Sequence, residues 1–498
     1  MAGLVIAHDD AVAPRAWAGL GIVAGASFVT SLDALVLYVA FGAIHRDFPH
    51  IGAPALSWIF SGYTIVVAAG MIAAGCWADR LGRRRVFLGG MGVFTAASAI
   101  CAFAPDARVL IAARVLQGFG AAALTPASLA LILRAFPKSR VPQAIALWAA
   151  AGALAAALGP TVGGLCVEAW GWRSVFVLNV PIGVAVALLG PRLLDESREP
   201  AGSRLPDPVG TVLVTAALVL LALALVQSSA WGWSSARTVG ALLGGIVMLG
   251  AFVIRCASVV NPVLALDLFS EPGFRWANLG QLVYGTGFTI MFFGNVQFLA
   301  NVWGYSPVRT GLALVPGPLV VFLLAPRLGK LAGRIGQRPI LISGGVISTA
   351  AAVFLLSNVD SAPAYLLVWL PYAFVSGLGV AMVLPLLTSA AVAGLSADRF
   401  ATGSAVTAAL RALSQTFGVA VFVAVVGRAA PGELLAQHRL AWWLVAAAGV
   451  AVSATAWSLP RAGSAARASR ATTSSPSTIV PGEPALTRTR GTLRGVPT

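Results

Sequence analysis

Apolar stretches of about 20 residues recur along almost the whole of this 498-residue chain, from residue 18 to residue 459. A helix of that length crosses about 30 Å of hydrocarbon. Lipid leaves the backbone groups of an open strand edge unpaired, so each stretch is predicted to be a helix. Composition agrees, because 58% of the residues are hydrophobic and only 10% are charged. The pattern predicts an all-α integral membrane protein with about fourteen spans in a lipid bilayer.

The placement of basic residues predicts how the chain is oriented. An even number of spans puts both termini on one side of the membrane. The loops on that side carry 18 Arg and Lys residues, and the opposite loops carry 7. Basic loops stay inside, so we expect both termini to be cytoplasmic, in a multi-pass protein of the inner or plasma membrane. Residues 1–15 contain Asp9 and Asp10 and lack a basic leader region, so we expect the first apolar stretch to be an uncleaved span.

The net charge of +16 does not indicate nucleic-acid binding, because the charge lies mostly in loops and in the tail after residue 459. An arginine-containing tail rich in Ser, Thr, Pro and Gly is predicted to be disordered and to face anionic lipid headgroups. The four cysteines lack the spacing of metal sites, so neither a metal nor a disulfide is expected. No cofactor is expected either.

Two loops predict an internal repeat. The loop after the second span reads GCWADRLGRRR from residue 75, and the loop after the tenth reads GKLAGRIGQR from residue 329. Gly, Ala, Arg and Gly recur at the same offsets, which implies two six-helix halves with two helices inserted between them. The expected organisation begins with a cytoplasmic N-terminal segment (1–17) and a first six-helix bundle (18–190). An insert of two helices with flanking loops (191–260), a second six-helix bundle (261–459) and a disordered cytoplasmic tail (460–498) follow. Transporters built from repeats place their substrate site between the halves.

Further motifs strengthen a family resemblance. Span four contains Arg114-Val-Leu-Gln117-Gly118, and span five contains Gly159-Pro160 and Gly163-Gly164. With the loop at 75–85 and this topology, the chain resembles the major facilitator superfamily, and specifically its fourteen-span drug:proton antiporter branch. The resemblance implies a protein that works as a monomer and expels small molecules in exchange for protons.

The loop after span two is, by this resemblance, a gate that must break as the halves rock. Its candidate residues are Gly75, Asp79, Arg80, Gly82, Arg83 and Arg84. The alternative is a basic loop that only fixes topology. The second copy of the loop has Gly333 where the first has its acid, which puts the same role there in doubt.

Asp33 and Arg114 are the candidates for proton coupling. Asp33 is the one acidic residue that we place inside a span. A charged side chain in lipid is unfavourable by roughly several kcal/mol unless it has a partner. The alternatives are a hydrogen-bonded structural acid and an arginine that reaches up to the membrane surface. The sequence does not establish whether the two side chains meet.

Span five supplies a candidate antiporter hinge, formed by Gly152, Gly159, Pro160, Gly163 and Gly164. Small residues four apart let two helices approach closely, and a proline removes one helix hydrogen bond. Ordinary small-residue packing is the alternative interpretation. Candidate substrate contacts between the halves are Trp58, Tyr63, Gln117, Gln297, Arg411 and Gln415.

The leading hypothesis is proton-driven export of drugs, antibiotics or similar small amphiphilic molecules. Export of an endogenous metabolite, such as a secondary metabolite, a siderophore or an amino acid, remains the alternative. No GxxxxGK[ST] loop is present, which disfavours an ATP-driven pump. An intramembrane enzyme is disfavoured because His8, His45, His50 and His438 are all expected outside spans, and no catalytic residue is expected.

Overall fold

Helices make up nearly all of the chain that the computed structural model describes, which is residues 13–137, 140–197, 207–260, 262–395, 400–427 and 431–460. These ranges contain no strand. Fourteen segments within them are long and apolar enough to cross a membrane. The predicted all-α fold with about fourteen spans is therefore confirmed. The terminal segment 1–12 and the tail from 461 lie outside the described residues.

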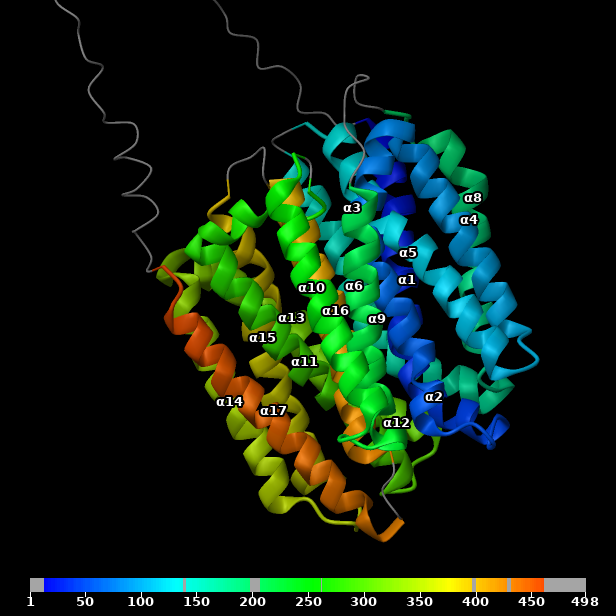
Figure 1. Cartoon of the computed structure of the whole chain (residues 1–498), viewed down its shortest axis with the longest axis vertical. Coiled ribbons are helices and arrows are strands. Elements are labelled where there is room, and N and C mark those ends of the chain that lie inside the picture. The colour runs from blue at the N-terminus through cyan, green and yellow to red at the C-terminus, as the bar shows by residue number, and fades with distance from the viewer. Residues whose placement is uncertain are drawn as a thin grey trace, which may run out of the picture.

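The first six spans form one group of packed helices, drawn from blue to teal in Figure 1. They comprise α1 (Pro14–Asp47), α2 (Ala53–Leu56) with α3 (Trp58–Leu81), α4 (Arg83–Ala102), α5 (Ala107–Ala135), α6 (Val141–Trp170), and α7 (Ser174–Val177) with α8 (Asn179–Leu193). Local sequence sets several of these ends. Asp106 caps α5 through the backbone amides of Arg108 and Val109, and Gly82 joins α3 to α4 at a φ of 111°, where a side chain is unfavourable.

The last six spans form the second group. After η1 (Leu266–Ser270) these are α11 (Pro272–Asn301), α12 (Pro307–Leu314) with α13 (Pro316–Ile335), α14 (Gln337–Asn358), η2 (Tyr365–Trp369) with α15 (Leu370–Ala393), α16 (Phe400–Val426), and α17 (Leu434–Trp457) after η3 (Pro431–Glu433). The described chain begins and ends on one face of the molecule, at the top of Figure 1. We call it the termini face and the opposite one the far face.

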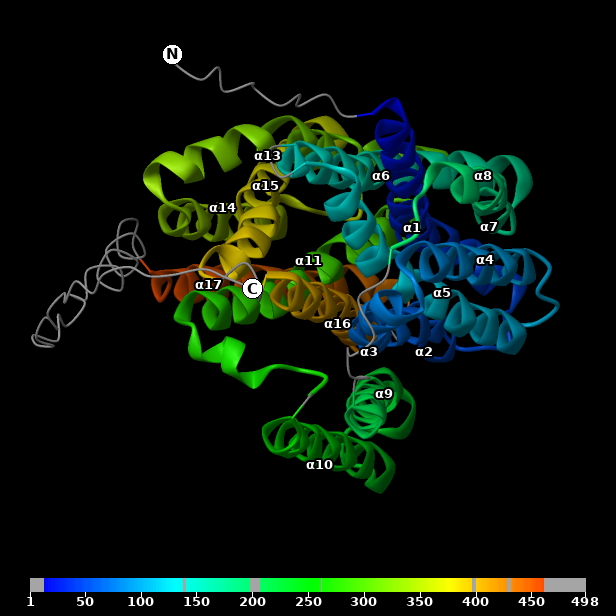
Figure 2. The same cartoon turned by 90° about the horizontal axis from the view of Figure 1, so that it is seen from above.

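The two remaining spans, α9 (Pro208–Trp231) and α10 (Ala236–Ser258), lie outside the two groups in Figure 2. Leu218 and Ala222 of α9 pack with residues of α3 and with Ala412 of α16, so α9 contacts one helix from each group. Asp207 caps α9 and accepts hydrogen bonds from the guanidinium of Arg255 at 2.8 and 3.2 Å. That interaction holds the pKa of Asp207 below its usual value. It joins the end of α10 to the start of α9 at the termini face.

Apolar contact between the two groups is concentrated toward the far face. Tyr38 and Phe60 of the first group pack against Phe293 of the second, and Phe293 also meets Phe422. One buried cluster therefore runs through both groups there. Toward the termini face each group has a separate buried cluster of its own. The buried apolar cluster shared by both groups therefore lies at the far face, while α3 and α16 add a smaller contact that includes Ala412.

Small residues of α6 make the closest backbone contact between the groups. A side chain on Gly164 would collide with the carbonyl of Pro307, and one on Gly311 would collide with the carbonyl of Pro160. The backbone amide of Val308 also donates to the carboxylate of Glu168 at 3.1 Å. The predicted small-residue motif thus brings α6 and α12 together at backbone distance.

The same helix packs on α1. A Cβ atom on Gly159 would lie 3.1 Å from the Cβ of Leu35, and one on Gly163 would lie 2.9 Å from a methyl of Val36. Gly152 faces the hydroxyls of Ser27 and Ser31. α6 therefore connects α1 of the first group to α12 of the second.

One prediction about the histidines is wrong. His438 was expected outside a span, but it lies in α17 with its side chain fully buried beside Phe298, Phe422 and Trp442. His45 likewise lies in the last turn of α1. The apolar windows stop at polar residues, whereas the helices continue for one or two further turns; His438 is thereby buried against neighbouring helices and His45 stays exposed.

We expect Gly164→Leu to destabilise the far-face contact, because a side chain there meets backbone that cannot rotate away. Overpacking of this kind costs about 1–3 kcal/mol. Thermal unfolding of the purified chain in detergent should show a lower midpoint. Gly240→Leu in α10 is the matched control, because a Cβ there meets nothing within 4 Å. Equal midpoints for the two variants would contradict the contact.

Candidate functional site

Asp33 lies in the middle of α1 with its side chain 2% exposed, and the side chain of Arg114 from α5 is 1% exposed. The two predicted candidates for proton coupling meet directly: Nη1 of Arg114 donates to Oδ2 of Asp33 at 2.6 Å. A carboxylate and a guanidinium thus share a site that neither lipid nor water reaches.

The other oxygen of Asp33 receives two further hydrogen bonds. Nε2 of Gln117 donates to Oδ1 at 3.1 Å, and Nδ2 of Asn179 donates to the same atom at 2.7 Å. Every partner of the carboxyl group is therefore a donor. Three donors to one carboxyl group, one of them a guanidinium, form a strong, charge-assisted set of hydrogen bonds.

Arg114 is held from three further directions. Its Nε donates to the carbonyl of Ile59 at 3.1 Å, and its Nη1 also donates to Oε1 of Gln117 at 2.6 Å. Its Cζ lies 4.2 Å from the centre of the Tyr63 ring, in the geometry of a cation–π contact. The guanidinium is bound by α1, α3 and α5 together.

Asn179 extends the network to two more helices. Its amide nitrogen also donates to the hydroxyl of Ser98 at 2.9 Å, and that hydroxyl donates to the carbonyl of Phe176 at 3.0 Å. Asn179 begins α8 and Ser98 lies in α4. We call Asp33, Ser98, Arg114, Gln117 and Asn179 the proton network. It joins α1, α4, α5 and α8, with Ile59 and Tyr63 of α3 completing its wall.

Two members of the proton network were missed as site residues from the sequence. Neither Asn179 nor Ser98 was among the predicted site residues. A signal was present, because both are polar residues inside predicted spans, where a side chain without a partner is unfavourable. The sequence did not reveal which acid they serve, since that depends on how five helices pack.

The candidate gating loop has its described contacts within its own half. The backbone amide of Arg84 donates to Oε1 of Glu196 at 3.2 Å, and its guanidinium donates to the carbonyls of Pro191 and Leu194. A Cβ on Gly82 would lie 2.6 Å from the Glu196 carboxylate, a second reason for glycine there. Glu196 follows α8 and was not predicted as a site residue. The side chain of Asp79 lies outside the described residues, and Gly75 and Arg80 lie in α3.

The candidate substrate residues do not form one cluster. Gln117 belongs to the proton network, Tyr63 lies in its wall against Arg114, and Trp58 packs with α9 and α16. Gln297 is buried toward the far end of α11, where it accepts a hydrogen bond from Asn301 at 3.0 Å. Arg411 is exposed and Gln415 is half-buried on α16.

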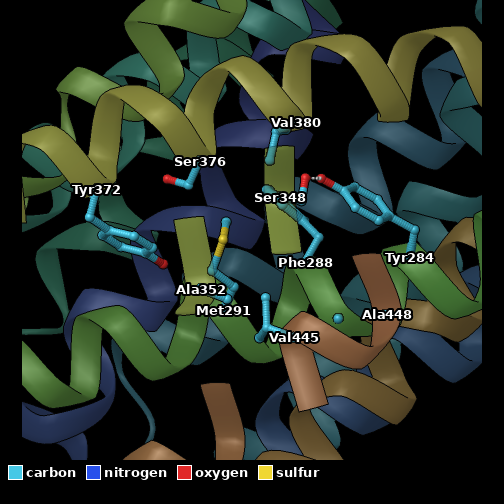
Figure 3. A pocket seen from close by; sticks show the side chains of 11 residues that line it. Tyr284, Phe288, Met291, Ser348, Ala352, Tyr372, Ser376, Val380, Val445 and Ala448 are labelled. Carbon is cyan, nitrogen blue, oxygen red and sulfur yellow. Dashed lines mark hydrogen bonds between the residues drawn. The ribbon is translucent and has the colours of Figure 1, made fainter. Parts of the chain in front are cut away.

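The second group contains an uncharged polar cluster on α11, α14, α15 and α17, which are the first, third, fourth and sixth of the last six spans. Tyr284 and Ser348 share a hydrogen bond of 2.6 Å, Asn295 donates to Tyr372 at 3.0 Å, and Trp442 donates to Asn295 at 3.2 Å. Figure 3 shows part of this cluster around a cavity of about 10 Å³. A cavity that small holds about one water and no drug.

Comparisons with known proteins agree with this architecture. Residues 23–419 match the Major Facilitator Superfamily. The chain is 35% identical over 416 residues to the multidrug resistance protein Stp of Mycobacterium tuberculosis, covering 81% of this chain and 73% of that protein. It is 33% identical over 419 residues to the cephamycin export protein CmcT of Amycolatopsis lactamdurans, covering 83% and 86%. The crystal structure of a D-xylose-proton symporter matches with a TM-score of 0.63 at 13% identity, over 89% of this chain and 97% of that one.

The chain belongs to the major facilitator superfamily, a class of membrane transporters that act on small molecules. Its fourteen candidate spans make it a multi-pass membrane protein. The relatives named for drug resistance and export confirm the predicted resemblance to the drug-exporting branch.

We expect Asp33→Asn and Arg114→Gln each to lower thermal stability strongly, because removing one partner of a buried ion pair leaves a charge uncompensated, at about 3–5 kcal/mol. The double variant should lose clearly less than the sum of the two. A double-mutant cycle on apparent unfolding midpoints measures the difference.

The control is the surface pair of Asp47 and Arg173, whose side chains are 48% and 43% exposed. Asp47→Asn should cost far less, since exposed pairs contribute about 0–1 kcal/mol. Additive losses at Asp33 and Arg114 would show that the pair is not coupled.

Proposed function

We propose that this chain is a secondary active exporter that exchanges protons for drugs, antibiotics or similar small amphiphilic molecules. The observation that carries the proposal is the ion pair of Asp33 and Arg114, enclosed in a helix bundle that can rock. The names of the relatives, which include multidrug resistance protein and drug efflux pump, support the substrate class. The proposal gives no role to a catalytic residue, a metal or a cofactor.

The coupling step is the uptake of a proton by Asp33. Protonation removes the negative charge that balances Arg114 and places a donor among three donors. The carboxyl group must then rotate or move away from Arg114 and Asn179. Loss of the proton restores the charge and the three hydrogen bonds, so Asp33 favours a different local arrangement in each protonation state.

Movement at Asp33 has a direct route to the far-face contact. Asp33 lies one turn or less from Leu35 and Val36, which pack against Gly159 and Gly163 of α6. The residues that follow these two glycines in α6, Pro160 and Gly164, make the contacts with Gly311 and Pro307 of the second group. A shift of α1 against α6 would therefore open or close the far face, which is the exchange of access that a transporter needs.

The direction of transport follows from orientation. With 18 basic residues in loops on the side of the termini and 7 on the other side, the termini face is cytoplasmic. Because the shared apolar cluster lies at the far face, the arrangement described here is the one that we propose receives a molecule from the cytoplasm. A single chain contains both six-helix halves, α9 and α10, which supports a functional monomer.

A narrower role is the second candidate. One relative is named an export protein for a single compound, cephamycin. This chain would then export one endogenous metabolite. Accumulation assays with a panel of unrelated compounds separate the two, because a single-compound exporter lowers the level of one chemical class alone.

Asp33→Asn should abolish proton release driven by drug in proteoliposomes, since asparagine neither takes up nor releases a proton. Asp47→Asn is the matched control on the same helix and should behave as wild type. The measurement compares the change in internal pH on drug addition at equal protein content. Proton-coupled transport that persists in the Asp33 variant would place the coupling site elsewhere.

Reporter fusions test the orientation. A fusion after Gly82, between α3 and α4 at the termini face, should report the cytoplasm. One after Trp233, between α9 and α10 at the far face, should report the outside. The opposite pair of results would reverse the direction of transport proposed here.

A further inference from the structure

Arg411 has an exposed side chain although it lies near the middle of α16, eleven positions after Phe400 in a helix that ends at Val426. A rise of 1.5 Å per residue puts it roughly 16 Å from the start of the helix. A cation at this depth is unfavourable in lipid, so it has to face a polar space within the protein.

Its neighbours on α16 show which way Arg411 points. Leu413, two positions and about 200° around the helix, packs in the cluster with α9. Ser414 lies against Gly285 of α11, and the hydroxyl of Thr416 meets that of Thr64 in α3. Arg411 therefore points away from Leu413 and α9, on the side of α16 between its contacts with α11 and α3.

Arg411 makes no side-chain hydrogen bond or ion pair with any described residue. Arg114 differs completely, because it is buried and bound by Asp33, Gln117 and Ile59. The carboxylate of Asp33 is 2% exposed and fully occupied by its three donors, so a cationic molecule between the halves does not reach it. Among the described mid-span side chains, the charge that faces the space between the halves is positive.

We propose that Arg411 is the binding group for an organic anion, so that the exported molecules are small amphiphiles with a carboxylate or phenolate. This inference rests on the proposed export function and names its substrate class. A planar guanidinium donates two parallel hydrogen bonds to a carboxylate, and a site shielded from bulk water strengthens them. Anion and proton then bind at separate places, and the conformational change rather than direct competition couples them.

Polar groups beside Arg411 suit this role. Gln415 and Ser404 share its face of α16, one turn and two turns away, and both are half-buried. On α11, Gln281 lies near Gly285 close to Ser414, with neither its amide nitrogen nor its oxygen hydrogen-bonded. Gln281 is fully buried, so Gln415 and Ser404 are the groups placed to contact a molecule bound at Arg411.

Binding of two dyes of opposite charge to the purified full chain tests the proposal. Fluorescein is an anion at pH 8 and ethidium is a permanent cation, and fluorescence anisotropy reports the affinity of each without any need for proton coupling. The variants are Arg411→Gln, Arg411→Lys and, as a control with the same change in net charge, Arg275→Gln at the exposed start of α11.

Wild type should bind fluorescein more tightly than ethidium. Arg411→Gln should weaken fluorescein binding about tenfold or more, the size expected for a charge-assisted hydrogen bond. Its ethidium affinity should stay the same or rise. Arg411→Lys should keep most of the fluorescein affinity, and Arg275→Gln should keep all of it.

Absence of fluorescein binding by wild type, or an equal loss for both dyes in Arg411→Gln, would overturn the anion site. A different result would contradict the export function alone. In that case a proton gradient would drive neither dye across the proteoliposome membrane, while fluorescein binding would still depend on Arg411.

Discussion

The structure depends on one charge pair, Asp33 with Arg114, held 2.6 Å apart where neither water nor lipid has access. Each charge alone would be strongly unfavourable in that place, and together they are stable only because the surrounding donors and the carbonyl of Ile59 satisfy both groups. Four spans of the first half supply these partners. The pair therefore holds the helices of that half together. We expect a change in its charge to shift the helices that carry it.

Corresponding spans of the two halves pack around different polar groups. The first, third, fourth and sixth spans of one half meet around ionised groups, and the corresponding spans of the other meet around Tyr284, Asn295, Ser348, Tyr372 and Trp442, which are all neutral. Under the proposed function, the half that contains Asp33 is the one that responds to a proton. The halves touch through aromatic rings and backbone contacts at the far face, and α9 packs across the seam between α3 and α16.

Much of this was predictable from the sequence, because lipid makes every intramembrane charge conspicuous. Span number, Asp33, Arg114 and the small-residue motif of α6 follow from that rule and from residue spacing. The identity of the other partners did not follow: Asn179, Ser98 and Glu196 reach their positions only when helices far apart in the chain pack together.

His438 was misplaced because hydropathy ends a span at the first polar residue, whereas α17 begins at Leu434 and buries the ring among Phe298, Phe422 and Trp442. Arg411 was predicted as a substrate contact, but its lack of a described partner became visible only from the structure.

The central claim is that Asp33 changes its protonation state during the transport cycle. Infrared difference spectroscopy on the reconstituted protein, recorded on substrate addition at constant pH, observes a carboxyl group as it gains or loses a proton. The account predicts a carboxylic acid band in the difference spectrum that Asp47→Asn retains and that Asp33→Asn lacks. A band that persists unchanged without the carboxyl group of Asp33, or a wild-type spectrum without any such band, would contradict it.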